Sequence, residues 1–515
     1  MIWRVLLLLA GATVSGATYF VDYGSGSDSN AGTSTGAAWQ HIPGDDRATG
    51  SAAITLSSGD VVVLRGGVAY AHDSTSVWRL NSSGVTIRSG HLHSPQWGTD
   101  RAEVDLAASV PSNDAVDGAW YLSNYQDATI EGIRFRDGPA YDDSYCAAIA
   151  WRGTGGTHSG LLVQDCVFTN IVESAVYVVG SWDAGTFSDT VTVQNCEFYD
   201  IGTHGVFLRY GLRDCHVYTN TFRRIGTRSA SPAPGGDPVG VFGHDSPSWN
   251  KDLVVRGNDM ADIPIKSYVI LSDQTVGALI EKNILWGTNG YSGFDLNGRL
   301  TNGVIRNNSI DMEVENFYGP IAMDTDQGTT AIDGLQIHNN TIRAATPNVG
   351  LVFFGRGNSG TTTPAIRNVD IRNNVLTLTT ASRSVVYIEA DSGGGPIADL
   401  DTITLDFNAY GPNGNSTPFH LAGTSYSLAG WRALGHGWDA NSKEGVPTYA
   451  SGFGALDGAD TVARDAGFNL QSYFQTDILG TTRAGLWDVG AYDYATPPSS
   501  SANVTAATVG TLSIQ

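Results

Sequence analysis

Acidic residues recur near the ends of short apolar segments in the middle of the chain. The segments "SYVILSD", "SGFDLNG" and "GPIAMDTD" carry aspartates, while "VGVFGHD" and "HGVFLR" add a histidine and an arginine. Two carboxyl groups held near each other can perform acid–base catalysis, one donating a proton while the other accepts one. The candidate catalytic residues, with Asp295 and Asp324 as the central pair, are Asp295, Asp324, Asp326, Asp273, His244 and Arg209.

Residues suited to sugar binding recur in and beside the same segments. Aromatic rings pack against the faces of sugars, and charged or amide side chains hydrogen-bond to their hydroxyls. Arg209 and Arg356 would orient hydroxyls or a substrate carboxylate. The predicted substrate-binding residues are Tyr177, Phe207, Phe242, Asp245, Lys266, Asn297, Arg356 and Tyr387.

These residues are far apart in the sequence, and an asparagine motif indicates how the fold brings them together. Segments such as "VIRNNSI", "QIHNNTI" and "DIRNNVL" align on one asparagine, and the spacing between successive motifs varies from 24 to 38 residues. A constant motif with variable spacing indicates a repeat of short strands joined by loops of different length. The aligned column is Ile133, Cys166, Cys196, Asn220, Asn258, Asn283, Asn308, Asn340, Asn374 and Asn408.

Each repeat predicts three short strands, because apolar residues alternate with polar ones. Coiling three parallel strands per turn stacks equivalent positions about 4.8 Å apart. A buried asparagine can then donate its side-chain amide to the asparagine of the next coil, and asparagine tolerates the left-handed backbone of a sharp bend. The sequence therefore predicts an all-β, three-sheet parallel solenoid with an asparagine ladder. Cys166 and Cys196 would continue that ladder, and a disulfide between them stays open.

The first strand of each coil predicts two outward-facing rows. One row holds Ala150, Tyr177, Phe207, Phe242, Ile270, Asp295, Ala322, Val352 and Tyr387. The other holds Arg152, Val179, Arg209, His244, Ser272, Asn297, Asp324, Phe354 and Glu389. Asp295 and Asp324 would lie on adjacent coils, offset by two residues, with a backbone separation of roughly 8 Å. Inverting glycoside hydrolases separate their two carboxyl groups by about 6.5–9.5 Å.

This pattern resembles the right-handed parallel β-helix of the pectin-lyase-like superfamily over about residues 18–412. The N-terminal segments "YFVDYGSGSDSNAGTSTGAAW" and "LSSGDVVVLRGGVAY" resemble the start of many secreted members. The resemblance implies that the face of the first sheet is the substrate groove and that the partner is a polysaccharide. The segment "GTHGV" is similar to the Gly-His-Gly motif of polygalacturonases, but the other motifs of that family are missing, so it is not among the candidates.

Three functions remain open from the sequence. The first is hydrolysis of a polysaccharide, which requires no cofactor. The second is a lyase or epimerase reaction on a uronic-acid polymer, in which Asp273, Asp295 and Asp324 hold Ca²⁺, a cation that prefers oxygen ligands. Arg209, His244 or Lys266 would then act as the base. The third is glycan binding without turnover, as in an adhesin or surface protein.

Composition and the chain ends set further expectations. The net charge of −22, without a basic cluster, argues against nucleic acid binding and favours a neutral glycan. Residues 1–17 read as a secretory signal peptide, since Arg4 precedes an apolar run that is too short to span a bilayer. We therefore expect a secreted protein that has no membrane contact after cleavage. The other expected divisions are an N-terminal cap (about 18–60), a C-terminal cap (413–495) and a linker or tail (496–515). Nothing in the sequence indicates an oligomeric state.

Overall fold

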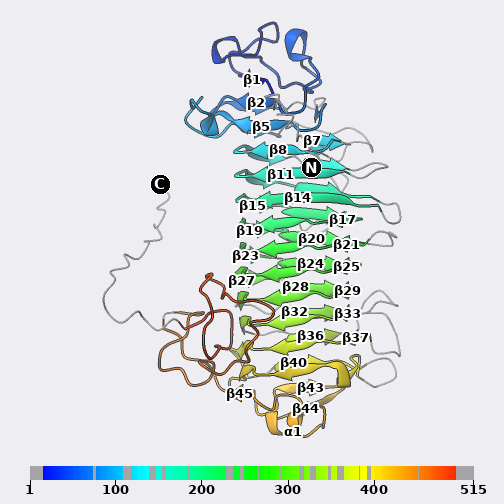
Figure 1. Ribbon diagram of the computed structural model, residues 1–515, viewed down its shortest axis with the longest axis vertical. Helices are drawn as coiled ribbons and strands as arrows, with labels where there is room; N and C mark the ends of the chain where they lie inside the picture. The colour runs from blue at the N-terminus through cyan, green and yellow to red at the C-terminus, as the bar shows by residue number, and fades with distance from the viewer. Residues whose placement is uncertain are drawn as a thin grey trace, which may run out of the picture.

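The computed structural model is an elongated rod built from stacked coils (Figure 1). The described residues are 16–72, 77–107, 118–123, 125–138, 147–152, 158–181, 186–227, 236–243, 249–264, 266–272, 274–289, 292–312, 318–324, 332–345, 349–355, 365–381, 383–390, 396–450 and 452–494. Within this part of the chain, no helix is both long enough and apolar enough to cross a bilayer.

Each coil contributes strands to three sheets, named here A, B and C. Sheet B contains β4 (Trp78–Arg79), β7 (Gly118–Ser123), β10 (Ala147–Arg152), β13 (Ser174–Val179), β16 (Val206–Arg209), β20 (Val239–Phe242), β24 (Val269–Ser272), β28 (Ser292–Asn297), β32 (Gly319–Asp324), β36 (Gly350–Gly355), β40 (Ser384–Ile388), β43 (Phe419–Leu421) and β44 (Thr424–Tyr426).

Sheet A follows sheet B within a coil, and several of its strands are split in two. It contains β1 (Thr18–Val21), β2 (Val61–Leu64), β5 (Thr86–Ser89), β8 (Ala128–Glu131), β11 (Ser159–Gln164), β14 (Ser188–Gln194), β17 (Leu212–Arg213), β18 (His216–Tyr218), β21 (Asn250–Lys251), β22 (Val254–Arg256), β25 (Thr275–Val276), β26 (Leu279–Glu281), β29 (Leu300–Thr301), β30 (Val304–Arg306), β33 (Ile332–Asp333), β34 (Gln336–His338), β37 (Ile366–Arg367), β38 (Asp370–Arg372) and β41 (Thr404–Asp406).

Sheet C completes each coil. It contains β3 (Ala69–Ala71), β6 (Glu103–Asp105), β9 (Arg134–Gly138), β12 (Val167–Ile171), β15 (Glu197–Ile201), β19 (Thr221–Ile225), β23 (Asp259–Ile263), β27 (Ile284–Asn289), β31 (Ser309–Met312), β35 (Thr341–Ala344), β39 (Val375–Leu378), β42 (Ala409–Gly411) and β45 (Lys443–Glu444). The helix α1 (Leu428–Arg432) and 3₁₀ turns at Thr35–Ala37, Gly50–Ala52, Gly90–Leu92 and Leu400–Thr402 lie between strands.

Identical side chains stack along the interior of the rod. The rings of Phe135, Phe168, Phe198 and Phe222 follow one another at centroid distances of 5.1, 4.9 and 4.6 Å and lie within 8° of parallel. All four rings are fully buried. Parallel pairing in register produces this stacking, because it repeats the same position at the strand spacing.

The asparagine ladder is confirmed. The side-chain amide of each asparagine from Asn220 to Asn374 donates to the side-chain oxygen of the next ladder asparagine, at 2.9–3.2 Å. The same amide also donates to a backbone carbonyl, for example Asn308 to Ile280 at 3.0 Å. Each buried amide therefore finds its hydrogen-bond partners within the stack of coils, and these bonds offset the free-energy cost of burying it.

The structure adds two details to the predicted ladder: the residue that adopts the left-handed backbone, and the state of the two cysteines. The left-handed backbone belongs to the residue before each ladder position, such as Asn307 at φ 52° and Asn339 at φ 51°, and not to the ladder asparagine itself. Cys166 and Cys196 are buried free thiols, not a disulfide. The Cys166 backbone N–H points to the Cys196 sulfur at 3.4 Å, so the cysteines continue the ladder as predicted.

The end of the chain folds back along the rod. After β45, residues 452–494, called the C-terminal arm, lie beside the later coils, and Figure 1 shows this segment in orange to red. The Asn373 side chain donates to the Phe468 carbonyl at 2.7 Å and accepts from the Phe468 N–H at 2.8 Å. The Asn339 side chain donates to the carbonyls of Asp488 and Gly490, each at 3.0 Å.

Candidate functional site

The outward face of sheet B carries the predicted catalytic pair. Asp295 lies between Ile270 and Ala322 in the sheet, and Asp324 lies next to Asn297. The two aspartates are therefore on adjacent strands, offset by two residues, as the sequence predicts. Each is only 3% exposed.

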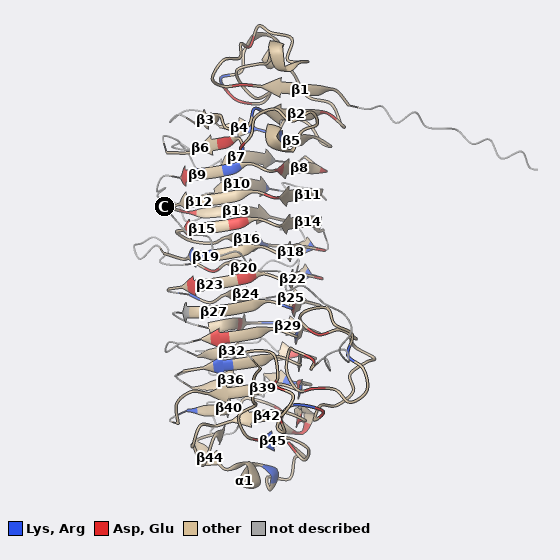
Figure 2. Cartoon of the chain, turned by 90° about the vertical axis from the view of Figure 1, so that its left-hand side faces the viewer, with Lys and Arg blue, Asp and Glu red and all other residues tan. Residues whose placement is uncertain are grey.

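The surroundings of these aspartates differ from those of the acidic residues on sheet C. On sheet C, outward carboxylates face arginines of an adjacent coil, as in Arg343–Asp311 and Arg223–Asp259, both at 2.5 Å. Figure 2 views this face, with acidic and basic bands along its strands. The in-register neighbours of Asp295 and Asp324 on sheet B are uncharged residues. Charge matching in register therefore accounts for the sheet C carboxylates, whereas the residues in register with Asp295 and Asp324 carry no charge.

The two predicted rows of outward-facing residues on sheet B need two corrections. Phe242 lies opposite Arg209 and Ser272, so it belongs to the second row, and Gly240 takes the place opposite Phe207. Val352 and Phe354 belong to the interior, while Phe353 faces outward between Ala322 and Tyr387. The apolar runs "VGVF" and "GLVFF" fit more than one register, because every residue in them can be buried.

Five predicted site residues lie outside the described residues: Asp273, Asp326, His244, Asp245 and Arg356. Of the proposed calcium ligands, the structure describes only Asp295 and Asp324. Within the described ranges, no three His, Cys, Asp or Glu side chains are grouped so that they could hold a metal ion.

The predicted aromatic residues of the earlier coils form one cluster on the same face. The rings of Tyr177 and Phe207 stack at 5.2 Å, and Phe207 meets Phe242 edge-on at 5.2 Å. Arg209 donates to the Tyr177 hydroxyl at 3.3 Å, and its guanidinium carbon lies 4.3 Å from the centre of the Tyr210 ring. Tyr177 and Phe207 are almost fully buried, whereas Phe242 is half-buried.

The other predicted binding residues are spread along the face. Tyr387 stacks flat on His420 with centroids 4.1 Å apart, several coils beyond the carboxylates. Asn297 lies directly between Ser272 and Asp324 and is half-buried. Lys266 is also half-buried and precedes Ser267 at the beginning of the β24 coil. The structure thus brings Asn297 and Lys266 to the carboxylates, but not Tyr387.

Two residues that the sequence analysis passed over meet beside these groups. The Asp237 backbone N–H donates to Nδ1 of His204 at 3.1 Å, and the Asp237 carboxyl oxygen lies 3.6 Å from the same nitrogen. Because Nδ1 accepts, the neutral ring carries its proton on Nε2. The His204 ring stacks on Phe207 at 4.1 Å. Gly240 leaves room for it, since a Cβ there would lie 2.9 Å from Nδ1.

Ser267 connects this pair to the catalytic candidates. Its backbone N–H donates to Oδ1 of Asp237 at 2.9 Å, and its hydroxyl donates to Oδ2 of Asp295 at 3.3 Å. Asp237, Ser267 and Asp295 come from three successive coils. We call His204, Asp237, Ser267 and Asp295 the His204 cluster.

Burial keeps the first two members of this cluster uncharged. It lowers the pKa of His204 to about 3, assisted by the positive charges of Lys266 and Arg209. Burial also raises the pKa of Asp237 to about 8; the charge of Asp295 adds to this shift, while Lys266 opposes it. At pH 7 the imidazole is therefore neutral and the carboxyl keeps its proton. Shifts of this size in opposite directions are typical of functional sites.

A sequence signal existed for only one of these two residues. His204 is the histidine of "GTHGV", whereas Asp237 stands in "GGDPVG" without any recognised motif. Together the described groups provide buried carboxyls, a neutral imidazole and an aromatic surface on one face. That set can bind a sugar and move protons at it.

Comparison with known proteins gives structural matches alone. No protein-family model matches the chain. No curated protein matches it either. The solved structure of XylC in complex with xylose matches with a TM-score of 0.53 and 9% identity, over 93% of this chain and 98% of that chain.

Two further structures are similar. The catalytic unit of a GH87 α-1,3-glucanase from Streptomyces thermodiastaticus strain HF3-3 matches with a TM-score of 0.50 and 12% identity, over 77% of this chain and 64% of that chain. A GH136 lacto-N-biosidase from Eubacterium ramulus matches with a TM-score of 0.42 and 14% identity, over 67% of this chain. This chain spans 66% of that protein, just under two thirds of its length. At these identities the similarity is one of fold alone, and in fold the chain is a right-handed parallel β-helix.

Proposed function

We propose that this protein hydrolyses a polysaccharide on the outward face of sheet B. The observation that carries the proposal is the placement of Asp295 and Asp324 on adjacent strands, offset by two residues, with both side chains withdrawn from solvent. Strand geometry puts their backbones roughly 8 Å apart. This separation lies within the range of about 6.5–9.5 Å that leaves room for an attacking water in inverting glycoside hydrolases.

In this reaction one carboxyl group of the pair protonates the glycosidic oxygen while the other activates water on the opposite face of the sugar. Asp237 acts as a positioning residue. Ser267 links it to Asp295, and in its neutral form it adds no second negative charge beside that residue. Phe242 and Asn297, both half-buried on this face, would contact the bound sugar.

Charge and the similar structures support a neutral polysaccharide as the substrate. The chain carries a net charge of −22, which repels a polyanion. Two of the similar structures, a protein in complex with xylose and the catalytic unit of an α-1,3-glucanase, support a neutral sugar polymer. The apolar N-terminal run supports action outside the cytoplasm.

The test is a glycan panel with two readouts. The purified protein is incubated with xylan, α-1,3-glucan, polygalacturonate and alginate, with and without EDTA, while reducing ends and the absorbance of unsaturated uronates are followed. We expect reducing ends from a neutral glycan, no chromophore, no effect of EDTA, and an inverted anomeric product by NMR. Asp295→Asn and Asp324→Asn should each lower kcat by at least about 100-fold, since each removes a general acid or base.

Asp333→Asn is the matched control, because Asp333 lies on sheet A and pairs there with Arg367 at 2.9 Å. It should retain full turnover. Retained turnover in both Asp295→Asn and Asp324→Asn would refute the site. A chromophore that disappears with EDTA would instead establish a calcium-dependent lyase, and glycan binding without any product would establish a binding protein.

A further inference from the structure

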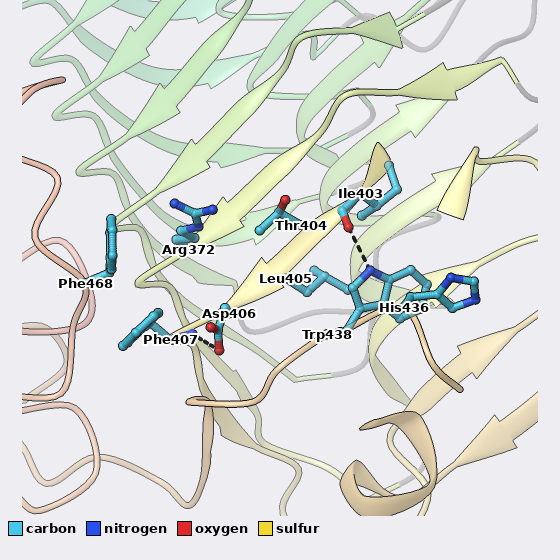
Figure 3. Close-up of a pocket in the computed structure, with 10 residues that line it drawn as sticks. Arg372, Ile403, Thr404, Leu405, Asp406, Phe407, His436, Trp438 and Phe468 are labelled. Carbon is cyan, nitrogen blue, oxygen red and sulfur yellow. Dashed lines mark hydrogen bonds between the residues drawn. The ribbon is translucent and has the colours of Figure 1, made fainter. Parts of the chain in front are cut away.

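A cavity lies on sheet A, on a different face of the rod from the catalytic candidates. It has a volume of about 290 Å³ and is drawn in Figure 3. Its floor is formed by the outward side chains of β38 and β41, where Arg372 lies opposite Asp406 in register. The volume is near the lower end of the range for small-molecule sites, about 300–1,000 Å³. We call it the sheet A cavity.

Aromatic rings from three separate segments border this cavity. Phe468 comes from the C-terminal arm and is 40% exposed, although it meets Phe407 with ring centroids 5.3 Å apart. On the opposite side His436 lies over Trp438 at 4.7 Å. Figure 3 shows Phe468 and Phe407 at one end of the cavity and His436 and Trp438 at the other. A large, partly exposed ring beside polar groups is a common way to bind the face of a sugar.

The backbone at Phe407 is strained where it borders the cavity. Phe407 has φ 55°, at the corner position that Asn307, Asn339 and Asn373 fill in the preceding coils. A bulky residue in the left-handed region is unfavourable, and such strain tends to occur at functional sites. Phe407 therefore replaces the corner asparagine of the three preceding coils at the point where the chain borders the cavity.

The polar groups around the cavity can serve a ligand with hydroxyl groups. Arg372 Nε lies 3.0 Å from Asp370 Oδ1, and within the described residues no hydrogen bond takes up its two terminal nitrogens. Asp406 accepts from the Asn441 side chain at 2.8 Å and from two backbone N–H groups, at 2.7 and 2.9 Å. A carboxylate has about four acceptor positions, so one remains. His436 Nδ1 is held by Asp401 at 2.9 Å.

We propose that the sheet A cavity is a second carbohydrate-binding site, which holds one neutral sugar residue of a polysaccharide away from the catalytic face. Phe468 packs against the sugar ring, Arg372 donates to its hydroxyls, and Asp406 accepts from one. A neutral sugar fits better than a uronate, because Asp370 and Asp406 flank Arg372 and a third carboxylate, Asp401, contacts His436 at the other end of the cavity. The site does not depend on hydrolysis at sheet B.

The test is affinity electrophoresis in native gels that contain soluble xylan, mixed-linkage β-glucan, dextran or polygalacturonate. The variants are Phe468→Ala and Arg372→Gln. The matched control is Phe453→Ala, because Phe453 also belongs to the C-terminal arm and packs on an arginine, Arg343, at 4.7 Å. We expect a neutral glycan to retard the wild type, and each of the two cavity variants to weaken that binding by about three- to tenfold, as for loss of one aromatic or polar contact.

Turnover of a short soluble substrate, measured in parallel, should be unchanged in both cavity variants. If hydrolysis is never found, the gel measurement still decides the binding site. Equal retardation of wild type, Phe468→Ala and Arg372→Gln would overturn the proposal, as would retardation by polygalacturonate alone or by none of the glycans. Equal weakening of glycan binding in Phe453→Ala and Phe468→Ala would also overturn it. The loss would then come from disturbed docking of the arm and not from a contact in the cavity.

Discussion

At the residue scale, the His204 cluster shows how burial, as the largest cause among several, can set protonation. His204 and Asp237 lie side by side, and in water at pH 7 an aspartate would be ionised and a histidine partly protonated. Both are removed from solvent here, so each group favours its uncharged form. The pair is therefore a neutral contact and not a salt bridge, despite the 3.6 Å between Nδ1 and the carboxyl oxygen.

Asp237 should make the folded state less stable as the pH rises towards 8. Its pKa is about 8 in the folded protein against 3.8 as the ordinary value, so between these limits the folded state binds a proton that the unfolded state lacks. The free energy of unfolding then falls with rising pH, by up to about 1.4 kcal/mol per pH unit. His204 has the opposite sign, but it titrates only below about pH 6.5.

The window from pH 6.5 to pH 8 therefore isolates Asp237. From pH 6.5 to pH 8 the free energy of unfolding of the wild type in urea should fall while that of Asp237→Asn stays level, because the variant lacks the titrating group, so the difference moves in favour of the variant. A parallel pair of curves would contradict the shifted pKa. Asp237→Asn should also keep its activity above pH 8 better than the wild type, since no charge then develops beside Asp295.

At the element scale, the asparagine doublets have two separate structural roles. The second residue of each doublet, as in Asn308, Asn340 and Asn374, builds the ladder inside the rod. The first residue adopts the left-handed bend and turns its side chain outward to the C-terminal arm, as Asn339 and Asn373 do. Earlier coils, with single asparagines at Asn220, Asn258 and Asn283, have other residues at the bend.

Asn339→Gly should loosen the arm without disturbing the bend. Glycine accepts the left-handed conformation, so the change removes the side-chain bonds to the Asp488 and Gly490 carbonyls and the bond that the Asn373 amide donates to Asn339 Oδ1 at 3.2 Å. Losing buried hydrogen bonds of this kind costs about 1–3 kcal/mol. We expect a lower free energy of unfolding in urea and faster proteolysis within residues 452–494.

The control is Asn302→Gly, because Asn302, between β29 and β30, has the same left-handed backbone at φ 55° but is exposed to solvent. Its unfolding free energy and proteolysis rate should match those of the wild type. If Asn339→Gly behaves like Asn302→Gly, the arm is held by its apolar contacts alone, for example those of Leu456 and Val489 with Val375.

At the scale of the whole molecule, the acidic surface should control which polymers can approach. A net charge of −22 repels polyanions over distances set by the Debye length, about 30 Å at 0.01 M salt and about 8 Å at 0.15 M. Turnover of a neutral glycan should therefore change by less than about twofold between these salt concentrations, whereas any interaction with polygalacturonate should strengthen as salt is added. Rates on polygalacturonate that are high at low salt and fall with added salt would contradict a neutral substrate.

The repeat itself could be read from the sequence because its rule is local. One asparagine per coil recurs between alternating apolar residues, and a buried amide in that position requires a partner at the strand spacing. Stacking in register follows, and with it the placement of Asp295 beside Asp324 on adjacent strands. The local pattern did not decide whether Cys166 and Cys196 form a disulfide, since free and bridged thiols both fit the ladder position. It also did not decide which face Val352 and Phe354 occupy, since either register of an apolar run fits.

Only the tertiary structure decided which residues from different coils and from the arm come into contact. His204 and Asp237 are 33 residues apart, and Asn339 meets Gly490 across 151 residues. The lengths of the loops between coils determine which of these residues come into contact, and no periodicity in the sequence specifies those contacts. The shifted pKa values are equally a product of burial, because an aspartate and a histidine have ordinary values until the surrounding coils exclude water.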